Sequence, residues 1–379
     1  MIPFNKPYLT GKESHYIYQA VLSGKISGDG IFTKKCHDFF EKQNLFKKVL
    51  LTTSCTDALE LSTLLLDIKP GDEIIIPSFT FVSTANAFAL RGAKIRFIDS
   101  RQDHPGMDEE KIEEVISSKT KAIVPVHYAG VASDMDKINS LAEKHNLFVV
   151  EDAAQAIDSY YIGKEGKTPL GACGDMGCFS FHETKNIMSG EGGMITLNKE
   201  KYFSRAEILR EKGTNRSAFF RGEVAKYNWV DIGSSFLPSD IIAAFLFAQL
   251  ENLEDIQTTR KAIWDLYHQR LELLEKKGHV SRPFIPSFAT QNGHMYYIVC
   301  QCFDERSRLI SFLREKGIYA VFHYLSLHTA PYFEANHDGR LLPQSDHFTD
   351  CLLRLPLFYE LEINQVNEIC DAIEEFFRS

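Results

Sequence analysis

The chain has 379 residues, of which 44% are apolar and 25% are charged, and its net charge is −9 at a pI near 5.8. This composition excludes a disordered protein and predicts one large core with room for a smaller second domain. The acidic balance, without any block of Lys and Arg, speaks against a nucleic-acid partner, so any phosphate recognition must be local.

The sequence also carries information on the location of the protein and on metal binding. The N-terminus lacks a basic region followed by an apolar one, and no apolar run approaches the roughly 18 residues of a membrane span. The eight cysteines include no CxxC pair and the thirteen histidines show no paired metal-ligand spacing. We therefore expect a cytoplasmic protein with reduced thiols, no membrane partner and no metal site.

From about residue 49 to residue 197, apolar runs typical of strands alternate with helical patterns. Strands are expected at 49–53, 73–76, 94–99, 122–127, 148–152, 178–181 and 194–197, and helices at 56–67, 82–91, 108–117 and 135–145. Such alternation predicts an α/β fold with a mostly parallel sheet that helices cover on both faces. We expect this large domain, with its N-terminal segment, to occupy residues 1–238.

The pattern changes after Pro238. Ser239-Asp240 is typical of a helix start, and an amphipathic pattern from there to about residue 276 predicts a long helix that bridges two domains. Beyond it we expect a strand at 294–302, a helix at 304–316, a strand at 319–324 and a closing helix at 364–378. This order predicts a smaller α+β domain, so that the second unit spans residues 239–379.

Two side chains with complementary chemistry follow predicted strands. Asp152 ends the apolar run that begins at Phe148, and Lys185 follows the strand at 178–181, 33 positions later. Either residue alone would more often be a helix cap or a solvated charge. Together they suit pyridoxal 5'-phosphate, because a lysine amine forms a Schiff base with its aldehyde and an acid keeps its ring nitrogen protonated. An acid at the carboxyl end of a buried parallel strand also points toward the crevice where such sheets bind ligands.

Other residues at strand ends could hold the rest of this cofactor. Ser54-Cys55-Thr56 lies between the first strand and its helix, where free backbone N–H groups favour a phosphate. Ser180 offers a hydroxyl on the strand that precedes Lys185, and the ring of Phe79 or Phe81 could stack on a flat cofactor. The alternatives are an ordinary helix cap for Ser54 or Thr56, a backbone-bonded serine, and aromatic core residues.

These residues, in this order, resemble the DegT/DnrJ-type sugar aminotransferases over essentially the whole chain. The resemblance rests on Ser54-Cys55-Thr56, Phe81, Glu151-Asp152-Ala153-Ala154-Gln155, Ser180 and Thr184-Lys185-Asn186. It implies the aspartate aminotransferase-like fold, known as fold type I of pyridoxal phosphate enzymes, and a nucleotide-linked keto-sugar as substrate. It also implies a homodimer with shared active sites and glutamate as the amino donor.

The resemblance further implies a role for each matching residue. Lys185 would form the Schiff base, Asp152 would pair with the ring nitrogen, and Gln155 would lie near the ring hydroxyl. The remaining contacts implied are the phosphate contacts of Ser54, the Cys55 backbone, Thr56 and Ser180, the stacking of Phe81, and an approach of Asn228 to the phosphate in the neighbouring subunit. Cys55 departs from the family's usual Gly.

The product is expected from longer similar strings, at 77–88, 124–130, 179–186, 210–216 and 354–358. They are most similar to the branch that converts TDP-4-keto-6-deoxyglucose into TDP-4-amino-4,6-dideoxygalactose for a surface polysaccharide, such as the O-antigen of lipopolysaccharide. Tyr128, His182 and His323 are possible polar neighbours of the sugar, with a core role as the alternative for each. A 3-aminotransferase acting on a 3-keto sugar, a related dehydratase with His in place of Lys185, and a non-catalytic cofactor-binding regulator are the competing functions.

Overall fold

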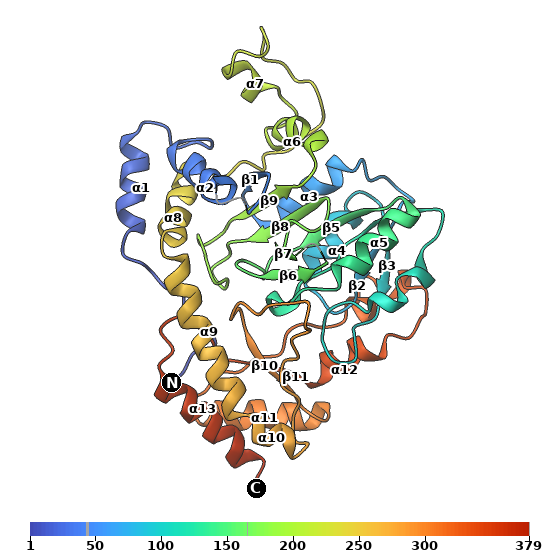
Figure 1. Cartoon of the computed structure of the whole chain (residues 1–379), viewed down its shortest axis with the longest axis vertical. Helices are drawn as coiled ribbons and strands as arrows, with labels where there is room; N and C mark the ends of the chain where they lie inside the picture. The colour runs from blue at the N-terminus through green and yellow to red at the C-terminus, as the bar shows by residue number, and fades with distance from the viewer. Residues whose placement is uncertain (43–44, 165, 379) are drawn as a thin grey trace.

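In the computed structural model, which describes residues 1–42, 45–164 and 166–378, a seven-stranded sheet forms the centre of the larger part of the molecule (Figure 1). Its strands, in spatial order, are β1 (Lys48–Thr52), β9 (Gly193–Leu197), β8 (Met176–Ser180), β5 (Phe148–Asp152), β4 (Thr120–Ile123), β2 (Glu73–Pro77) and β3 (Lys94–Ile98). Neighbouring strands are parallel except at β9, which is antiparallel to both β1 and β8. The carboxyl ends of the other six strands therefore share one edge of the sheet.

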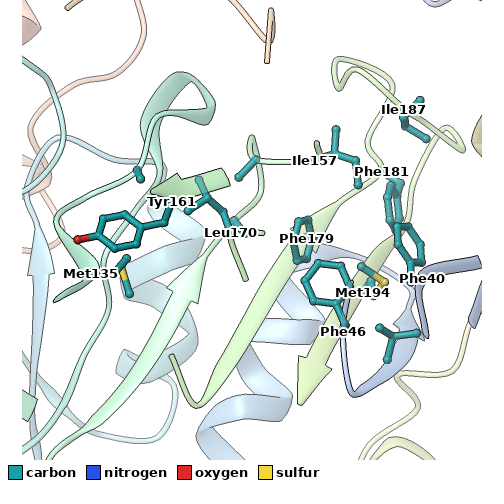
Figure 2. Packing of buried hydrophobic residues seen from close by; sticks show 14 of the residues in the cluster. Phe40, Phe46, Met135, Ile157, Tyr161, Leu170, Phe179, Phe181, Ile187 and Met194 are labelled. Carbon is teal, nitrogen blue, oxygen red and sulfur yellow. The ribbon is translucent and has the colours of Figure 1, made fainter. Parts of the chain in front are cut away.

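Both faces of this sheet are buried, and successive side chains of each strand enter different cores. Val49 and Leu51 pack into one apolar cluster, whereas Leu50 between them packs into the other. Figure 2 shows the first cluster at β8, where Phe179 and Phe181 lie against rings from α2 and the segment after it. Continuous burial of this kind explains why the strands read as unbroken apolar runs.

Helices cover these two faces and close the fold at the N-terminal side. They are α1 (Glu13–Leu22), α2 (Ile31–Lys42), α3 (Cys55–Leu65), α4 (Val82–Ala89), α5 (Met135–His145), α6 (Phe203–Arg210) and the short α7 (Arg216–Phe220), with a hairpin of β6 (Tyr160–Gly163) and β7 (Gly166–Pro169) between β5 and β8. The segment around α7 projects from the top of the molecule in Figure 1.

A second, two-stranded antiparallel sheet lies at the other end of the molecule. It consists of β10 (Tyr296–Val299) and β11 (Leu352–Leu355), with α8 (Asp240–Leu250), α9 (Leu253–Arg270), α10 (Glu272–Lys276), α11 (Phe303–Glu315), α12 (Pro343–Cys351) and α13 (Ile363–Phe376) completing this half of the chain. The long α9 runs from the large sheet to the small one (Figure 1). Helix α8 packs on α1 and α2, and Ile2 pairs with Ile318, so each half of the chain packs against elements of the other half. The division at residue 238 stays a prediction.

Three expected elements differ from the structure. The helix expected at 108–117 is a pair of 3₁₀ turns, Glu109–Lys111 and Glu113–Val115, because the buried Glu109 carboxylate accepts from the Asp134 amide and ties the segment to the start of α5. The strand expected at 319–324 makes only an isolated bridge from Val321 to Arg354. The long helix expected after residue 239 is three helices, α8 to α10.

Two of the expected absences can be compared with the described part of the chain. Within those residues, no helix combines the length and apolar character that a membrane span needs. No group of three or more His, Cys, Asp or Glu side chains there is arranged to hold a metal ion.

Candidate active site

The expected site residues meet at the carboxyl edge of the large sheet. Asp152 ends β5, Ser180 ends β8, Ser54 follows β1 and Phe81 caps the helix after β2. Because these strands are parallel, residues far apart in the sequence converge on one edge of the sheet, where open α/β sheets bind their ligands.

Asp152 is held in one orientation by two hydrogen bonds. Its Oδ2 accepts from the Thr84 hydroxyl at 2.7 Å, and its Oδ1 accepts from the Ala154 amide at 3.1 Å. Burial raises the pKa of the Asp152 carboxyl above its ordinary value, while both hydrogen bonds and the charge of Lys185 oppose that rise. A buried carboxylate fixed in this way is prepared for a cationic partner, such as a protonated ring nitrogen.

A second buried carboxylate lies one residue earlier and supports the end of β5. Glu151 and His127 are both fully buried, with His127 Nε2 at 2.9 Å from Glu151 Oε2. Glu151 also accepts from the amides of Gly171, Cys173 and Gly174. The His127 amide donates to the Asp152 carbonyl at 3.1 Å, so this network holds the backbone from which Asp152 projects.

Lys185 lies in a tight turn after β8. The turn is closed by the Phe181 amide, which donates to Gly192, and the Ser189 amide, which donates to Phe181, each at 2.8 Å. The neighbouring Asn186 is buried and bonded to His294 Nδ1 at 2.7 Å. The lysine backbone is therefore anchored on both sides.

Burial lowers the pKa of Lys185 to about 8. Nearby charges act in both directions, since Arg354 lowers this pKa further while Cys55 and Asp152 raise it. An amine with this pKa keeps a useful neutral fraction near neutral pH, and only the neutral amine is nucleophilic.

The turn after β1 forms a cradle at the N-terminus of α3. The Ser54 hydroxyl accepts from the Asp57 amide at 3.0 Å, so Ser54 is a helix cap, as the alternative interpretation had it, but its own proton stays available for donation. A Cβ added to Gly193 would come within 2.2 Å of the Ser54 carbonyl carbon and 2.5 Å of the Cys55 nitrogen. Glycine is thus required for β9 to lie against this turn.

The N-termini of two helices meet beside this cradle. The Thr56 hydroxyl of α3 donates to Ser83 Oγ of α4 at 2.8 Å. Both helices direct the positive end of their dipole toward the same place, which favours an anion such as a phosphate.

Gln155 and Phe81 are both in contact with Tyr324. Gln155 accepts from the Ala129 amide at 2.6 Å and donates to the Tyr324 hydroxyl at 3.1 Å. The Phe81 side chain is 53% exposed, and its ring centre lies 5.7 Å from that of Tyr324. Sequence reasoning missed Tyr324, although it ends the segment in which His323 was named.

Ser180 and His182 make local contacts at the start of the lysine turn. Ser180 Oγ accepts from the His182 amide at 3.3 Å, and His182 Nδ1 lies 3.0 Å from the Thr184 hydroxyl. Both side chains are partly exposed and could also contact a ligand.

Tyr128 and His323 are joined to each other. The fully buried Tyr128 donates to the His323 carbonyl at 2.8 Å, which agrees with the core role weighed for it, and we leave it out of the proposed substrate site. Burial, followed by the charge of Arg354, lowers the pKa of His323 to about 4, so His323 is neutral and its Nδ1 accepts from Arg354 Nη1 at 3.1 Å.

Asn228 lies apart from the other candidates. It is exposed on the projecting segment that follows α7 (Figure 1), and its backbone N–H donates to Asn215 Oδ1 at 2.7 Å. Its own chain's Lys185 and Asp152 lie at the sheet edge instead.

The described residues fit pyridoxal 5'-phosphate. They offer an amine of lowered pKa, a fixed acid, an anion cradle that an added Cβ would disrupt, and an exposed aromatic ring. An acid and a lysine at the carboxyl edge of a mostly parallel sheet define an enzyme of fold type I.

Comparison with known proteins identifies the family. The DegT/DnrJ/EryC1/StrS aminotransferase family matches residues 7–374, and the chain belongs to it. GDP-perosamine synthase of Escherichia coli O157:H7 is 33% identical over 377 residues, which are 99% of this chain and 98% of that protein. The structure of DesV from S. venezuelae in complex with a ketimine intermediate has a TM-score of 0.89 at 27% identity, covering 100% of this chain and 99% of that one.

A third comparison concerns the cofactor. A candidate sugar aminotransferase from Streptococcus pneumoniae, Spr1654, is 25% identical in its PLP form, with a TM-score of 0.89 and coverage of 100% of this chain and 98% of that one. A PMP form of Spr1654 also matches. Aminotransferases of this family depend on PLP, so the fold, the enzyme class and the cofactor expected from the sequence are confirmed. None of the relatives named here is a TDP-4-amino-4,6-dideoxygalactose transaminase, and the product stays a prediction.

Proposed function

We propose that the enzyme transfers the amino group of glutamate to TDP-4-keto-6-deoxyglucose and forms TDP-4-amino-4,6-dideoxygalactose and 2-oxoglutarate. The observation that carries the chemistry is the proximity of Lys185, Asp152 and the Ser54–Thr56 turn at one edge of the sheet, in a chain of this aminotransferase family. The similar strings at 77–88, 124–130 and 179–186 support the choice of sugar.

The proposed roles follow from the geometry of the chain's own groups. Bound PLP supplies an aldehyde that condenses with amines and a ring that withdraws electrons. Lys185, with its pKa near 8, would accept the proton from the carbon that bears the donor's amino group and release it later in the transfer. Asp152, fixed by Thr84 and Ala154, keeps the ring nitrogen protonated through a charge-assisted bond.

The dipoles of α3 and α4 hold the phosphate in this proposal. The hydrogen bond from the Thr56 hydroxyl to Ser83 links the starts of these two helices, and the Ser54 turn offers backbone amides. In this proposal Phe81 would stack on the cofactor ring, and Gln155 would lie near the ring hydroxyl. Ser180 is a further hydroxyl donor for the phosphate.

We also propose that the working unit is a homodimer with shared sites. The projecting segment exposes large apolar side chains, with Phe220 72% and Trp229 80% exposed. Apolar groups gathered on one such segment favour a surface that another subunit covers. Asn228, which lies between them in the sequence and directly precedes Trp229, would then reach the phosphate in the partner subunit.

A GDP-linked 4-keto sugar is the second candidate substrate. The observation that favours it is the 33% identity with a protein named GDP-perosamine synthase over nearly the whole length of both chains. The 3-keto isomer remains the alternative in regiochemistry, because the cofactor residues do not distinguish C3 from C4. The presence of Lys185 and the family assignment disfavour the dehydratase and the non-catalytic regulator. Cytoplasmic location stays a prediction.

The test is a competition between nucleotide sugars. The PLP-loaded enzyme and glutamate are offered TDP-4-keto-6-deoxyglucose, its 3-keto isomer and a GDP-linked 4-keto-6-deoxyhexose, and the products are identified by NMR. We expect an amine at C4 with galacto configuration on the TDP sugar, at a kcat/KM orders of magnitude above the 3-keto isomer. Preferential amination at C3, of the GDP sugar, or of no nucleotide sugar would refute the proposed substrate.

A further inference from the structure

His294 precedes β10 and is held against the turn that carries Lys185. Its amide donates to Asn292 Oδ1 at 3.0 Å, and its carbonyl accepts from Arg260 at 2.9 Å. Its ring bonds to Asn186, the residue after Lys185, with 2.7 Å between Nδ1 and Oδ1. The side chain is only 5% exposed. A histidine from the C-terminal half of the chain is therefore fixed beside the segment that bears the reacting amine.

The orientation of the Asn186 amide follows from its other partners. Its Nδ2 lies 2.9 Å from the backbone carbonyl of Asn292, which can only accept, so this atom must be the nitrogen. The same nitrogen donates to Gln257 Oε1 at 2.8 Å. The Gln257 amide is oriented in its turn, since its Nε2 donates to the same carbonyl and to the Asp158 carboxylate. The Asn186 atom that meets His294 is therefore the oxygen.

This orientation fixes the tautomer of His294. An amide oxygen carries no proton, so His294 Nδ1 must donate to it. In a neutral imidazole with its proton on Nδ1, Nε2 has a lone pair and is an acceptor. Burial lowers the pKa of His294 well below its ordinary value, and the charges of Lys185, Arg354 and Arg260 lower it further, so the ring is neutral. Nε2 is thus an acceptor whose position the protein defines.

This acceptor and the Lys185 amine complement each other. Among residues 1–42, 45–164 and 166–378, no group forms a hydrogen bond with His294 Nε2 or with Lys185 Nζ. Neither nitrogen is completely buried, so each can still take a partner. Of the charged groups that act on His294, Lys185 has the largest effect. Polar groups inside a protein are normally paired, and the flexible lysine side chain can bring its amine to this lone pair.

We propose that His294 is a further catalytic residue, whose Nε2 accepts a hydrogen bond from the Lys185 amine while that amine is not joined to the cofactor. The inference rests on the proposed role of Lys185, which must leave the cofactor aldehyde and then carry a proton. A hydrogen bond from the charged amine to a neutral acceptor stabilises the charged form, so His294 helps Lys185 to hold that proton. Asn186 is then a positioning residue, because it fixes the tautomer of His294.

Two substitutions separate the roles of the ring nitrogens. In His294→Asn the amide nitrogen can replace Nδ1 as a donor to Asn186, but no atom replaces Nε2. In His294→Gln the longer side chain places an amide oxygen near the position of Nε2, and the bond to Asn186 is lost. The matched control is His104→Asn, which changes another buried histidine, bonded to the Gly106 amide after β3. Circular dichroism reports folding, and a fluorescence titration reports PLP binding.

The first measurement uses the full chain freed of PLP. Traces of an amine-reactive reagent are applied over a range of pH, and mass spectrometry of the peptide with residue 185 gives the pH midpoint at which Lys185 becomes reactive. His294→Asn should lower this midpoint by about one pH unit, because a hydrogen bond to a charged group stabilises that group about tenfold or more. His294→Gln and His104→Asn should leave the midpoint close to that of the wild type.

The second measurement is a single turnover of the PLP-loaded enzyme with glutamate alone. His294→Asn should slow this half-reaction about 10–100-fold at saturating glutamate, with little change in the affinity for glutamate, since the bond acts on the proton and not on donor binding. His294→Gln should lose less. This order is the reverse of what a merely structural histidine would give, because Asn keeps the structural bond to Asn186.

A third measurement needs no substitution in the protein observed. ¹⁵N NMR of the wild type labelled at histidine reports the tautomer, and the His294 signal is identified by its loss in His294→Gln. A proton on Nε2 instead of Nδ1 would overturn the inference even if His294→Asn fails to fold. An unchanged Lys185 midpoint in His294→Asn, an equal shift in His104→Asn, or equal or greater damage by His294→Gln would also overturn it. If the wild type aminates no nucleotide sugar, the proposed substrate fails, while the midpoint and the tautomer still decide the role of His294.

Discussion

The lowered pKa of Lys185 can be tested directly in enzyme freed of its cofactor. An ordinary lysine, with a pKa of about 10.4, is neutral in only about 0.04% of molecules at pH 7. With its pKa near 8, Lys185 is neutral in about 10% of molecules, a gain of roughly 200-fold. Since the neutral amine is the nucleophile, its reactivity should rise about tenfold per pH unit up to about pH 8 and then level off.

Variants with changed charges should move this midpoint in opposite directions. Arg354→Gln removes a positive charge and should raise the midpoint, whereas Asp152→Asn removes a negative charge and should lower it. A unit charge about 10 Å away at an effective dielectric of about 20 is worth roughly 1.7 kcal/mol, so each shift should be about one pH unit.

The assay is competitive labelling with traces of an amine-reactive reagent across pH 6–11, followed by mass spectrometry of the peptide that contains residue 185. Surface lysines in the same digest provide the ordinary reference. A midpoint near 10, or shifts of both variants in the same direction, would refute the argument that burial and these two charges set the reactivity of Lys185.

Three further predictions follow from the site. Asp152→Asn should still bind PLP but lose about 10²-fold or more in transamination rate, since a neutral ring attracts electrons poorly. Single-turnover absorbance measures the rate, and a near-native value would contradict the role of the acid. Gly193→Ala should weaken PLP binding about 10–100-fold in a fluorescence titration, because the new Cβ displaces the Ser54 turn and its amide bonds to phosphate; unchanged affinity would remove the cradle from the phosphate site. Lys185→Ala subunits should regain activity in heterodimers with subunits disabled by an Asn228 change, and no recovery in demonstrated heterodimers would count against shared sites.

Much of the site follows from local sequence patterns. The positions of Asp152 and Lys185 could be predicted because buried strands appear in the sequence as short apolar runs, and the carboxyl ends of parallel strands share one edge of the sheet. The strand predicted at 148–152 is confirmed as β5, and the one at 178–181 overlaps β8. The fold class was expected from strand and helix alternation and from the family resemblance, and the structure confirms the mostly parallel sheet.

The groups that support these residues could not be predicted in the same way. Thr84 bonds to Asp152, 68 positions away, and Tyr324 bonds to Gln155, 169 positions away. The periodicity of a local sequence segment does not reveal such contacts. The segment expected as a strand at 319–324 carries β-favouring residues, but tertiary contacts leave it with an isolated bridge and use its polar groups at the site. Arg354 looks like an ordinary charge until β11 is seen to bury it.

The whole protein is acidic, whereas basic side chains gather near the proposed site, and this difference would let an acidic chain bind anions. The net charge is −9, yet the positive charge of Arg354 lowers the pKa of both Lys185 and Arg260, so three basic side chains lie close enough to influence one another, with Asp152 as a nearby acid. The cofactor phosphate is anionic, and so are the carboxylates of the proposed donor and the phosphates of the proposed nucleotide sugar. Exposed acids act across water and salt, which screen them within about 8–10 Å, whereas buried cations act through a medium of lower dielectric. Placement and burial, rather than composition, therefore decide what this site attracts, and the lowered pKa of Lys185 is a direct consequence of the same burial.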